Sequence, residues 1–361
     1  MTVMMKDDVF SMYRKYVDVD EDNIIFRDFI NSKLNYILVS IMEEVKIIEK
    51  KQYESISEDD INNIVSILMK LSLIARIDLI KCMESINGKD LSFIKQLKYS
   101  KQIIDYSLKI IVRLLINIKN EDMNFDNIEA LKNNDSISHS NRVFFNIIKF
   151  IKYYNKSINN NLVIDVRNNF KDKYLKYYKN IFKKFHIKKN ISQLEHVYKH
   201  GLREILFNEI VNISIAAFWY DIVNLKALNE CSNMKCYSYL KHFIKYNDEV
   251  SLIVGLHNEY YGHGHGIFLN YYNSIINRKP FLSPNYIISF DYNDALKLSS
   301  ISYFPSKVLE IVNLFDNMVY SNKEILDYNK ALEVMKENYL DKDVKIDPII
   351  FDVFSSFVLK K

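Results

Sequence analysis

Histidines and glycines gather in one short stretch of this chain, Gly255–Gly266, and both residue types can take part in chemistry there. The stretch holds four of only six glycines in 361 residues and three of the eight histidines. These residues are Gly255, Gly262, Gly264, Gly266, His257, His263 and His265. Imidazole nitrogens bind ions such as iron, zinc and copper, and glycines let backbone N–H groups approach a phosphate closely. The pattern indicates a metal-binding or phosphate-binding loop, although ordinary turns use the same residues.

Other side chains in the sequence could join such a site. His263 and His265 would lie on the same side of an extended segment, and Glu259 could add a carboxylate. His196 and His200 are separated by one helical turn, which would place both on one face of a helix. For each of these histidines, a surface or core position without a metal stays open as the alternative.

The elements that must position these residues are expected to be helices. Apolar residues recur at three- and four-residue steps in three stripes, 26–41, 61–71 and 97–115, which should form core faces. Ser57 and Asp60 form a capping-box pattern, and Asp347-Pro348 reads as an N-cap followed by proline at the first helical position. Little period-2 alternation is present. The sequence therefore predicts an all-α fold.

Three regions are expected along the chain: an N-terminal helical region over 1–160, a basic linker helix over 161–192 and a third region over 193–361. The segment Asn120–Asn141 is rich in Asn, Asp and Ser, which indicates a loop or weak helix. Nine basic residues and one acidic residue lie between Arg167 and Lys189. This segment could touch an anionic membrane or nucleic acid, or it could be a helix with a solvated lysine face. Further helices are expected over 305–320 and 327–339.

The composition narrows the class of protein. With 48% hydrophobic and 26% charged residues, the chain has ordinary globular composition. A formal net charge of +4 does not favour a nucleic-acid-binding protein. Three cysteines fit a reducing compartment better than a disulfide scaffold. Because no apolar window is long enough for a membrane span and the N-terminus lacks a signal-peptide pattern, we expect a cytoplasmic protein.

Four segments follow one another in an order that resembles the HD-GYP domain, the all-helical cyclic-di-GMP phosphodiesterase branch of the HD superfamily. They are 214–222 (SIAAFWYDI), 253–266 (IVGLHNEYYGHGHG), 308–318 (VLEIVNLFDNM) and 331–350, which contains KIDPII. The resemblance spans Gln193–Phe357 and implies a helical domain with a centre of two or three iron or manganese ions. Two such ions hold the scissile phosphate and generate a bound hydroxide that attacks phosphorus.

The resemblance assigns roles to individual positions. The family's His-Asp pair falls on Tyr220 and Asp221, and its helix Asp falls on Asn313. Its His-His pair falls on Leu256 and His257, so that Asp221 and His257 are the clear matches. The resemblance implies Asp221 and His257 as metal ligands, and the family's lone downstream His falls near Cys236 or, with a shifted gap, near His242. His263 and His265 could replace missing metal ligands from the loop itself. The implied ligand-contacting residues are Gly262, Gly264, Gly266, Tyr260 and Asn313, with Gly264-His265-Gly266 at the GYP triplet.

Two functions from different classes stay open. The first is metal-dependent hydrolysis of cyclic-di-GMP, with Asp221 as a catalytic metal ligand. The second is a catalytically inactive HD-GYP-like adaptor or nucleotide-binding interaction module, because Tyr220 and Asn313 are neutral where the family carries ligands. The expected partners are cyclic-di-GMP or a related nucleotide, proteins that contact the N-terminal helices, and a second copy of the chain in a homodimer.

Overall fold

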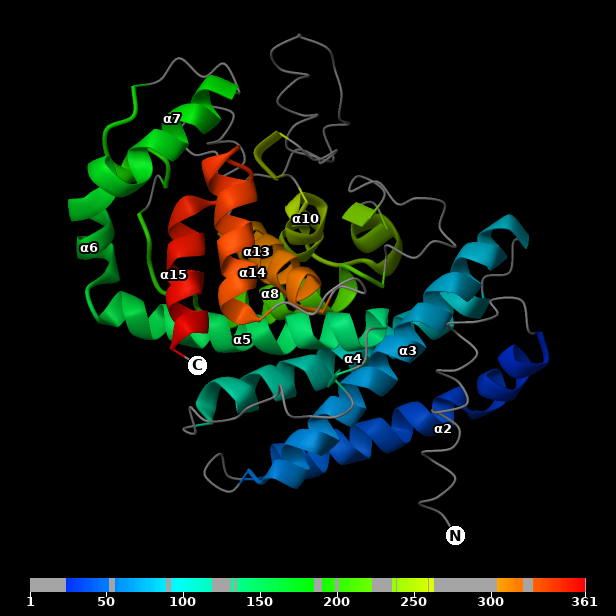
Figure 1. Cartoon of the computed structure of the whole chain (residues 1–361). Helices are drawn as coiled ribbons and strands as arrows, with labels where there is room; N and C mark the ends of the chain where they lie inside the picture. Colours follow the sequence, from blue (N-terminus) through cyan, green and yellow to red (C-terminus); the bar gives the residue numbers. More distant parts are fainter. Residues whose placement is uncertain are drawn as a thin grey trace. The chain divides into compact units, whose positions relative to one another are not determined.

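A computed structural model describes residues 24–51, 56–88, 92–118, 131–132, 135–184, 190–198, 201–222, 236–237, 239–258, 260–262, 304–320 and 327–360. Within these ranges every regular element is a helix, which confirms the predicted all-α fold (Figure 1). The chain divides into two compact units, 1–130 and 131–361. This division precedes the boundary expected at residue 160.

The first unit contains three long helices, α2 (Ile24–Glu49), α3 (Glu58–Gly88) and α4 (Ser92–Asn117), which pack against one another. The capping box predicted at the start of α3 is confirmed. The Ser57 N–H donates to Asp60 Oδ2 at 2.9 Å, and the Asp60 N–H donates to Ser57 Oγ at 3.2 Å. The apolar stripes expected on α3 and α4 are buried: Ile61, Ile64, Leu68, Leu71, Leu97, Ile103, Ile104, Leu108, Ile111 and Leu115.

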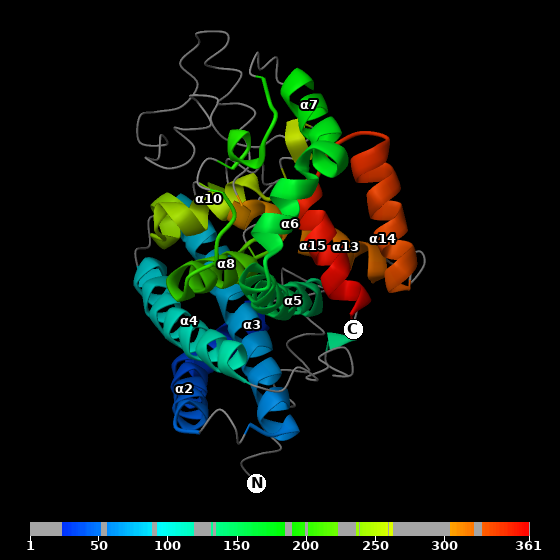
Figure 2. The ribbon, with the colours of Figure 1, turned by 90° about the vertical axis from the view of Figure 1, so that its left-hand side faces the viewer.

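The second unit is built around α5 (Ser136–Asn159), α8 (Phe207–Trp219), α10 (Asp248–Leu256) and α13 (Phe304–Val319). Helix α8 packs against both α5 and α10, and Figure 2 shows it between them. Helix α13 packs against α5, α8 and α10. The C-terminal helices α14 (Tyr328–Lys336) and α15 (Pro348–Leu359) cover α13. The large buried side chains of this core include Trp219, Phe144, Phe150 and Phe354.

The start of α5 lies within the segment Asn120–Asn141, for which a loop or weak helix is expected. The helix begins at Ser136, and Asp135 is its N-cap. The Asp135 carboxylate accepts the backbone N–H of Ser138 at 2.8 Å and the Ser138 hydroxyl at 2.9 Å. Asp and Ser favour helix caps as well as loops, because their short side chains bond to nearby backbone groups. The polar residues before Asn141 therefore start a helix, while residues 119–130 lie outside the described ranges.

The expected basic linker is helical: it contains α6 (Leu162–Asn169), a π-helical turn η4 (Phe170–Tyr174) and α7 (Leu175–Lys184). Its apolar face packs within the second unit, where Phe170, Tyr174, Tyr178, Ile181 and Phe182 are buried. The Tyr174 hydroxyl donates to Asp352 at 2.7 Å and the Tyr178 hydroxyl donates to Asp347 at 2.9 Å. These contacts attach the basic segment to α15 and to its N-cap.

The C-terminal helices follow the sequence closely. Helix α13 coincides with the helix expected over 305–320, and α14 lies within the one expected over 327–339, followed by a π-helical turn η10 (Glu337–Asp341). The N-cap predicted at Asp347 is confirmed, since its carboxylate accepts the N–H groups of Ile349 and Ile350, both at 3.0 Å. Among the described helices, none has the length and apolar character that crossing a membrane requires.

Candidate functional site

Tyr220 lies at the centre of the site, one residue after the end of α8. Its hydroxyl is 2.8 Å from His139 Nε2 on α5 and donates to Asn313 Oδ1 on α13 at 3.1 Å. The ring of His257, at the end of α10, meets the Tyr220 ring edge-on with centroids 5.2 Å apart. Side chains from four helical segments therefore converge on one tyrosine.

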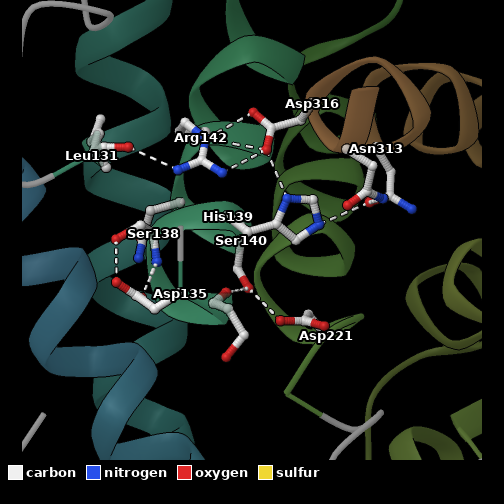
Figure 3. Close-up of polar contacts among 12 residues, drawn as sticks. Leu131, Asp135, Ser138, His139, Ser140, Arg142, Asp221, Asn313 and Asp316 are labelled. Atoms are coloured by element: carbon white, nitrogen blue, oxygen red, sulfur yellow. Dashed lines mark hydrogen bonds and ion pairs between the residues drawn. The ribbon is translucent and has the colours of Figure 1, made fainter. Parts of the chain in front are cut away.

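His139 links α5 to α13. Its Nδ1 lies 2.7 Å from Asp316 Oδ2 and its Nε2 lies 3.0 Å from Asn313 Oδ1 (Figure 3). Oxygens of Asp316 and Asn313 face the two ring nitrogens, an arrangement that favours a proton on both of them. Burial lowers the pKa of His139, but the hydrogen bond and negative charge of Asp316 outweigh it, so the pKa lies above its usual value.

Arg142 follows His139 by one helical turn and holds the same carboxylate. Its Nε donates to Asp316 Oδ1 at 3.0 Å, and its terminal Nη2 donates to Asp316 Oδ2 at 2.9 Å. Nη1 donates to the Leu131 carbonyl at 2.8 Å, and the guanidinium lies 3.9 Å from the centre of the Tyr320 ring. Figure 3 shows Arg142 and His139 both pointing toward Asp316. The buried Asp316 carboxylate is thus bonded on both oxygens by the Arg142 guanidinium and on one of them by the His139 ring.

The two residues that match the HD-GYP pattern most clearly are Asp221, which follows Tyr220 in the chain, and His257, whose ring contacts the Tyr220 ring. Asp221 is partly buried, and its Oδ2 lies 3.1 Å from the Ser140 hydroxyl. His257 is buried, and its Nδ1–H donates to the Val254 carbonyl at 2.6 Å. Burial lowers the pKa of His257 to about 4, against a smaller opposing effect of the Asp221 charge. His257 is therefore neutral at physiological pH.

A second polar cluster holds the turn that follows α10. The backbone N–H of Tyr260 donates to Glu310 Oε2 at 3.1 Å, and the Tyr261 hydroxyl donates to Asp347 Oδ2 at 2.9 Å. Lys307 Nζ donates to Glu310 Oε2 at 3.0 Å and lies 4.1 Å from the centre of the Tyr261 ring. Burial raises the pKa of Glu310 to about 7, although the Lys307 charge acts in the opposite direction. All of these charged groups are buried.

The same turn carries unusual backbone angles. Tyr260 has φ 39° and Tyr261 has φ 43°, both in the left-handed region that non-glycine residues rarely adopt. The Tyr260 ring lies tilted against Tyr339, with centroids 5.9 Å apart. Two adjacent tyrosines therefore take up positive φ values immediately before Gly262.

The other predicted site residues are placed only in part. The backbone of Gly262 ends the short helix η8 (Tyr260–Gly262), and the backbone of His242 lies in η7 (Tyr239–Ile244), with its side chain outside the description. His196 Nδ1 accepts the Ser192 N–H at 3.1 Å in an exposed turn. The predicted residues His200, Glu259, His263, Gly264, His265 and Gly266 lie outside the described ranges.

The donor set around Tyr220 does not fit a two-metal centre. Both oxygens of Asp316 and both nitrogens of His139 are engaged by protein groups. Tyr220 and Asn313 bring no negative charge to offset two divalent cations. In the described part of the chain, no group of three or more His, Cys, Asp or Glu residues is arranged to hold a metal ion.

Sequence reasoning missed His139, Arg142 and Asp316. A signal for them exists, because polar residues at every third position of α13 interrupt an apolar helix: Lys307, Glu310, Asn313 and Asp316. All of them are buried. A second signal is the polar run Ser138-His139-Ser140-Asn141-Arg142 within the first turns of α5. Buried polar side chains must find partners, so two such runs in apolar helices indicate that the helices meet there.

Comparison of the chain with protein-family profiles, with curated proteins and with solved structures gives no match in any of the three.

Proposed function

We propose that the second unit is a non-hydrolytic HD-GYP-like module that acts by binding a nucleotide or a protein in cyclic-di-GMP signalling. The convergence of four positions supports the HD-GYP-like scaffold. The pair Tyr220-Asp221, His257 and Asn313 come from three separate segments of the sequence, and the resemblance assigns all of them to one metal centre. The 3.1 Å hydrogen bond between Tyr220 and Asn313 and the ring contact between Tyr220 and His257 bring these positions together.

The observation that carries the non-hydrolytic part of the proposal is the state of Asp316. Its carboxylate is buried and bonded to the guanidinium of Arg142 and to the ring of His139. A guanidinium is always charged at physiological pH and cannot leave by deprotonation. Hydrolysis by two metals needs free anionic ligands and an activated water. Arg142 instead supplies the positive charge that neutralises this carboxylate.

Protein groups offset much of the negative charge of the site without a metal. The Arg142 guanidinium neutralises Asp316, and Asp316 raises the pKa of His139 above its usual value, which favours a second positive charge beside this carboxylate. His257 is neutral, because burial keeps its pKa at about 4. Among the described residues, no further carboxylate contacts Tyr220 that could neutralise the charge of two added divalent cations. This charge distribution favours a role in binding and scaffolding.

The experiment that tests the proposal uses the full-length protein, loaded anaerobically with Fe²⁺ or with Mn²⁺. Metal content is measured after removal of unbound metal, and cyclic-di-GMP turnover is followed by chromatography. We expect no stoichiometric iron or manganese and no turnover. Two bound ions per chain together with turnover would overturn the proposal and establish the phosphodiesterase alternative. Calorimetry with cyclic-di-GMP then distinguishes binding of a nucleotide from binding of a protein. Heat of binding without turnover would assign the second unit as a nucleotide-binding module.

A further inference from the structure

A groove lies between the basic segment and the C-terminal helices, away from the site around Tyr220. It has a volume of about 520 Å³ and is lined by η4, α7, α14 and α15. Figures 1 and 2 both show α15 between α6 and α14, which places the basic segment and α14 on opposite sides of α15. This volume falls within the range of about 300–1,000 Å³ that ligand pockets occupy.

The floor of the groove is apolar and its outer edge is exposed. Leu332 on α14, Leu340 on η10 and Phe351 on α15 line it and are themselves largely buried. Leu359, at the end of α15, also lines the groove and is 62% exposed, one of the few large apolar side chains at the surface of the second unit. The groove therefore offers a recess for an apolar side chain.

Ion pairs neutralise two acidic residues of the groove wall. Lys173 Nζ lies 2.8 Å from Asp352 Oδ2, an oxygen to which the Tyr174 hydroxyl also donates at 2.7 Å. Lys330 Nζ lies 3.3 Å from Glu333 Oε2. Because these carboxylates are paired, they add little negative potential to the groove.

A basic stripe runs along α7 from the groove, which Lys176 lines with its ammonium over the Tyr177 ring. Lys176, Lys179 and Lys183 are exposed and spaced three and four residues apart, so they share one face of the helix. No described acidic residue forms an ion pair with any of these three lysines. Across the groove, Lys336 on α14 is exposed and likewise has no ion pair with a described residue.

We propose that the groove and the stripe formed by Lys176, Lys179 and Lys183 are a docking surface for an acidic peptide segment of a partner protein. An apolar side chain of the peptide enters the groove beside Leu332 and Phe351, and neighbouring carboxylates lie over the stripe. The recess supplies the apolar contact and the stripe supplies charge complementarity, which fixes register and raises the association rate. This surface goes beyond the function proposed for the site around Tyr220, because the two share no residue.

The shape and charge of the surface favour a peptide over other polyanions. A membrane-binding surface projects its apolar side chains into the lipid, whereas Leu332, Leu340 and Phe351 lie at the floor of a recess. A nucleic acid presents a continuous row of phosphates, and the exposed carboxylate of Asp172 at the groove edge would repel it. A peptide can place single carboxylates over the stripe and avoid Asp172.

The test is fluorescence anisotropy of the full-length protein with a short labelled peptide in which one leucine is flanked by glutamates. The triple variant Lys176→Glu, Lys179→Glu, Lys183→Glu should bind this probe at least about tenfold more weakly than wild type. A matched control, Lys95→Glu, Lys98→Glu, Lys109→Glu, makes the same change of net charge at exposed positions of α4. This control should bind like wild type.

Two further probes separate the apolar and charged contributions. Replacing the leucine of the peptide by serine, or its glutamates by lysines, should each weaken binding by about tenfold. Equal loss in the α7 and α4 variants, or no binding of the original probe, would overturn the proposal. Binding of phosphatidylserine vesicles or of oligothymidylate that is lost only in the α7 variant, without peptide binding, would assign the surface to a membrane or to nucleic acid instead.

Discussion

The carboxylate of Asp316 is stabilised by groups that depend on one another. Arg142 donates to both of its oxygens, and His139 occupies a further position on one of them. His139 can remain protonated because Asn313 and Tyr220 offer oxygens to its other nitrogen. A histidine or an aspartate at either of these two positions would alter the protonation of His139. The neutral residues Tyr220 and Asn313 are therefore the side chains that suit His139 and Arg142 at this site.

Replacing Arg142 with Met should lower the free energy of unfolding by about 3–5 kcal/mol, because it leaves the Asp316 charge buried without its main partner. The measurement is urea denaturation followed by circular dichroism. The double variant Arg142→Met, Asp316→Leu should lose less unfolding free energy than the single variant, since both charges are removed together. A loss below about 1 kcal/mol in the single variant would mean that the pair behaves like an exposed one.

The two histidines of the site should titrate at opposite ends of the histidine range. We expect His139 to stay protonated above its usual pKa of about 6.5, because Asp316 stabilises the cation. His257 should stay neutral down to a pH of about 4, because it is buried. Proton NMR of the imidazole signals measures both, with His139→Gln and His257→Gln used to assign them. A His139 signal that titrates below the usual value would contradict the hydrogen-bonding scheme.

At the scale of elements, the N-cap of α15 has a wider role than capping. Asp347 Oδ1 accepts two backbone N–H groups of the helix. Its Oδ2 accepts the hydroxyls of Tyr178, on α7, and Tyr261, after α10, both at 2.9 Å. One buried carboxylate thus joins the start of α15 to two other parts of the second unit.

Asp347→Ala should therefore lower the free energy of unfolding by more than the loss of an ordinary helix cap does. A cap contributes about 0.5–2 kcal/mol, and each buried hydroxyl left without a partner costs about a further 1–3 kcal/mol. Asp327→Ala is the matched control, because Asp327 caps α14 by accepting only the exposed Lys330 N–H among the described bonds. Thermal unfolding of both variants measures the difference. Equal losses of stability in the two variants would show that the hydrogen bonds from the two tyrosine hydroxyls to Asp347 do not stabilise the fold.

Local patterns explain which of these elements could be predicted. Apolar periodicity and caps depend on residues within a few turns, and so the helices starting after Ser57 and Asp347 were predicted correctly. The contact between His139 and Asn313 joins residues 174 positions apart, and no local pattern encodes that pairing. The positive φ at Tyr261 was also beyond prediction, because tertiary contacts through its hydroxyl and ring offset an unfavourable conformation.

At the scale of the second unit, α13 connects the two buried polar clusters. Lys307 and Glu310 belong to the cluster that holds the turn after α10. Asn313 and Asp316, one and two turns further on, belong to the site around Tyr220. A helix with this polar stripe has few alternative registers, since a shift would leave buried charges without partners. Polar pairing therefore specifies how α13 sits among apolar neighbours.

Because both clusters contain buried titratable groups, the stability of the second unit should depend on pH in two opposing ways. Glu310 has a folded pKa of about 7, above its unfolded value, so the folded state holds the extra proton and stability falls as pH rises toward 7. His257 has a folded pKa of about 4, below its unfolded value, so stability rises as pH increases from 4 toward about 6.5. Between these limits the two effects offset each other in the wild-type protein.

Glu310→Gln should remove the pH dependence that Glu310 contributes to the stability of the second unit. Relative to wild type, the unfolding free energy of this variant should increase with pH across the interval from about 4.5 to 7, by at most about 1.4 kcal/mol per pH unit. Urea denaturation at several pH values measures this difference. Glu333→Gln, at a position 68% exposed on its side chain, is the control, and its difference from wild type should stay flat. A flat difference for Glu310→Gln as well would mean that Glu310 is ionised in the folded protein throughout, held by Lys307 and the Tyr260 N–H more strongly than burial opposes.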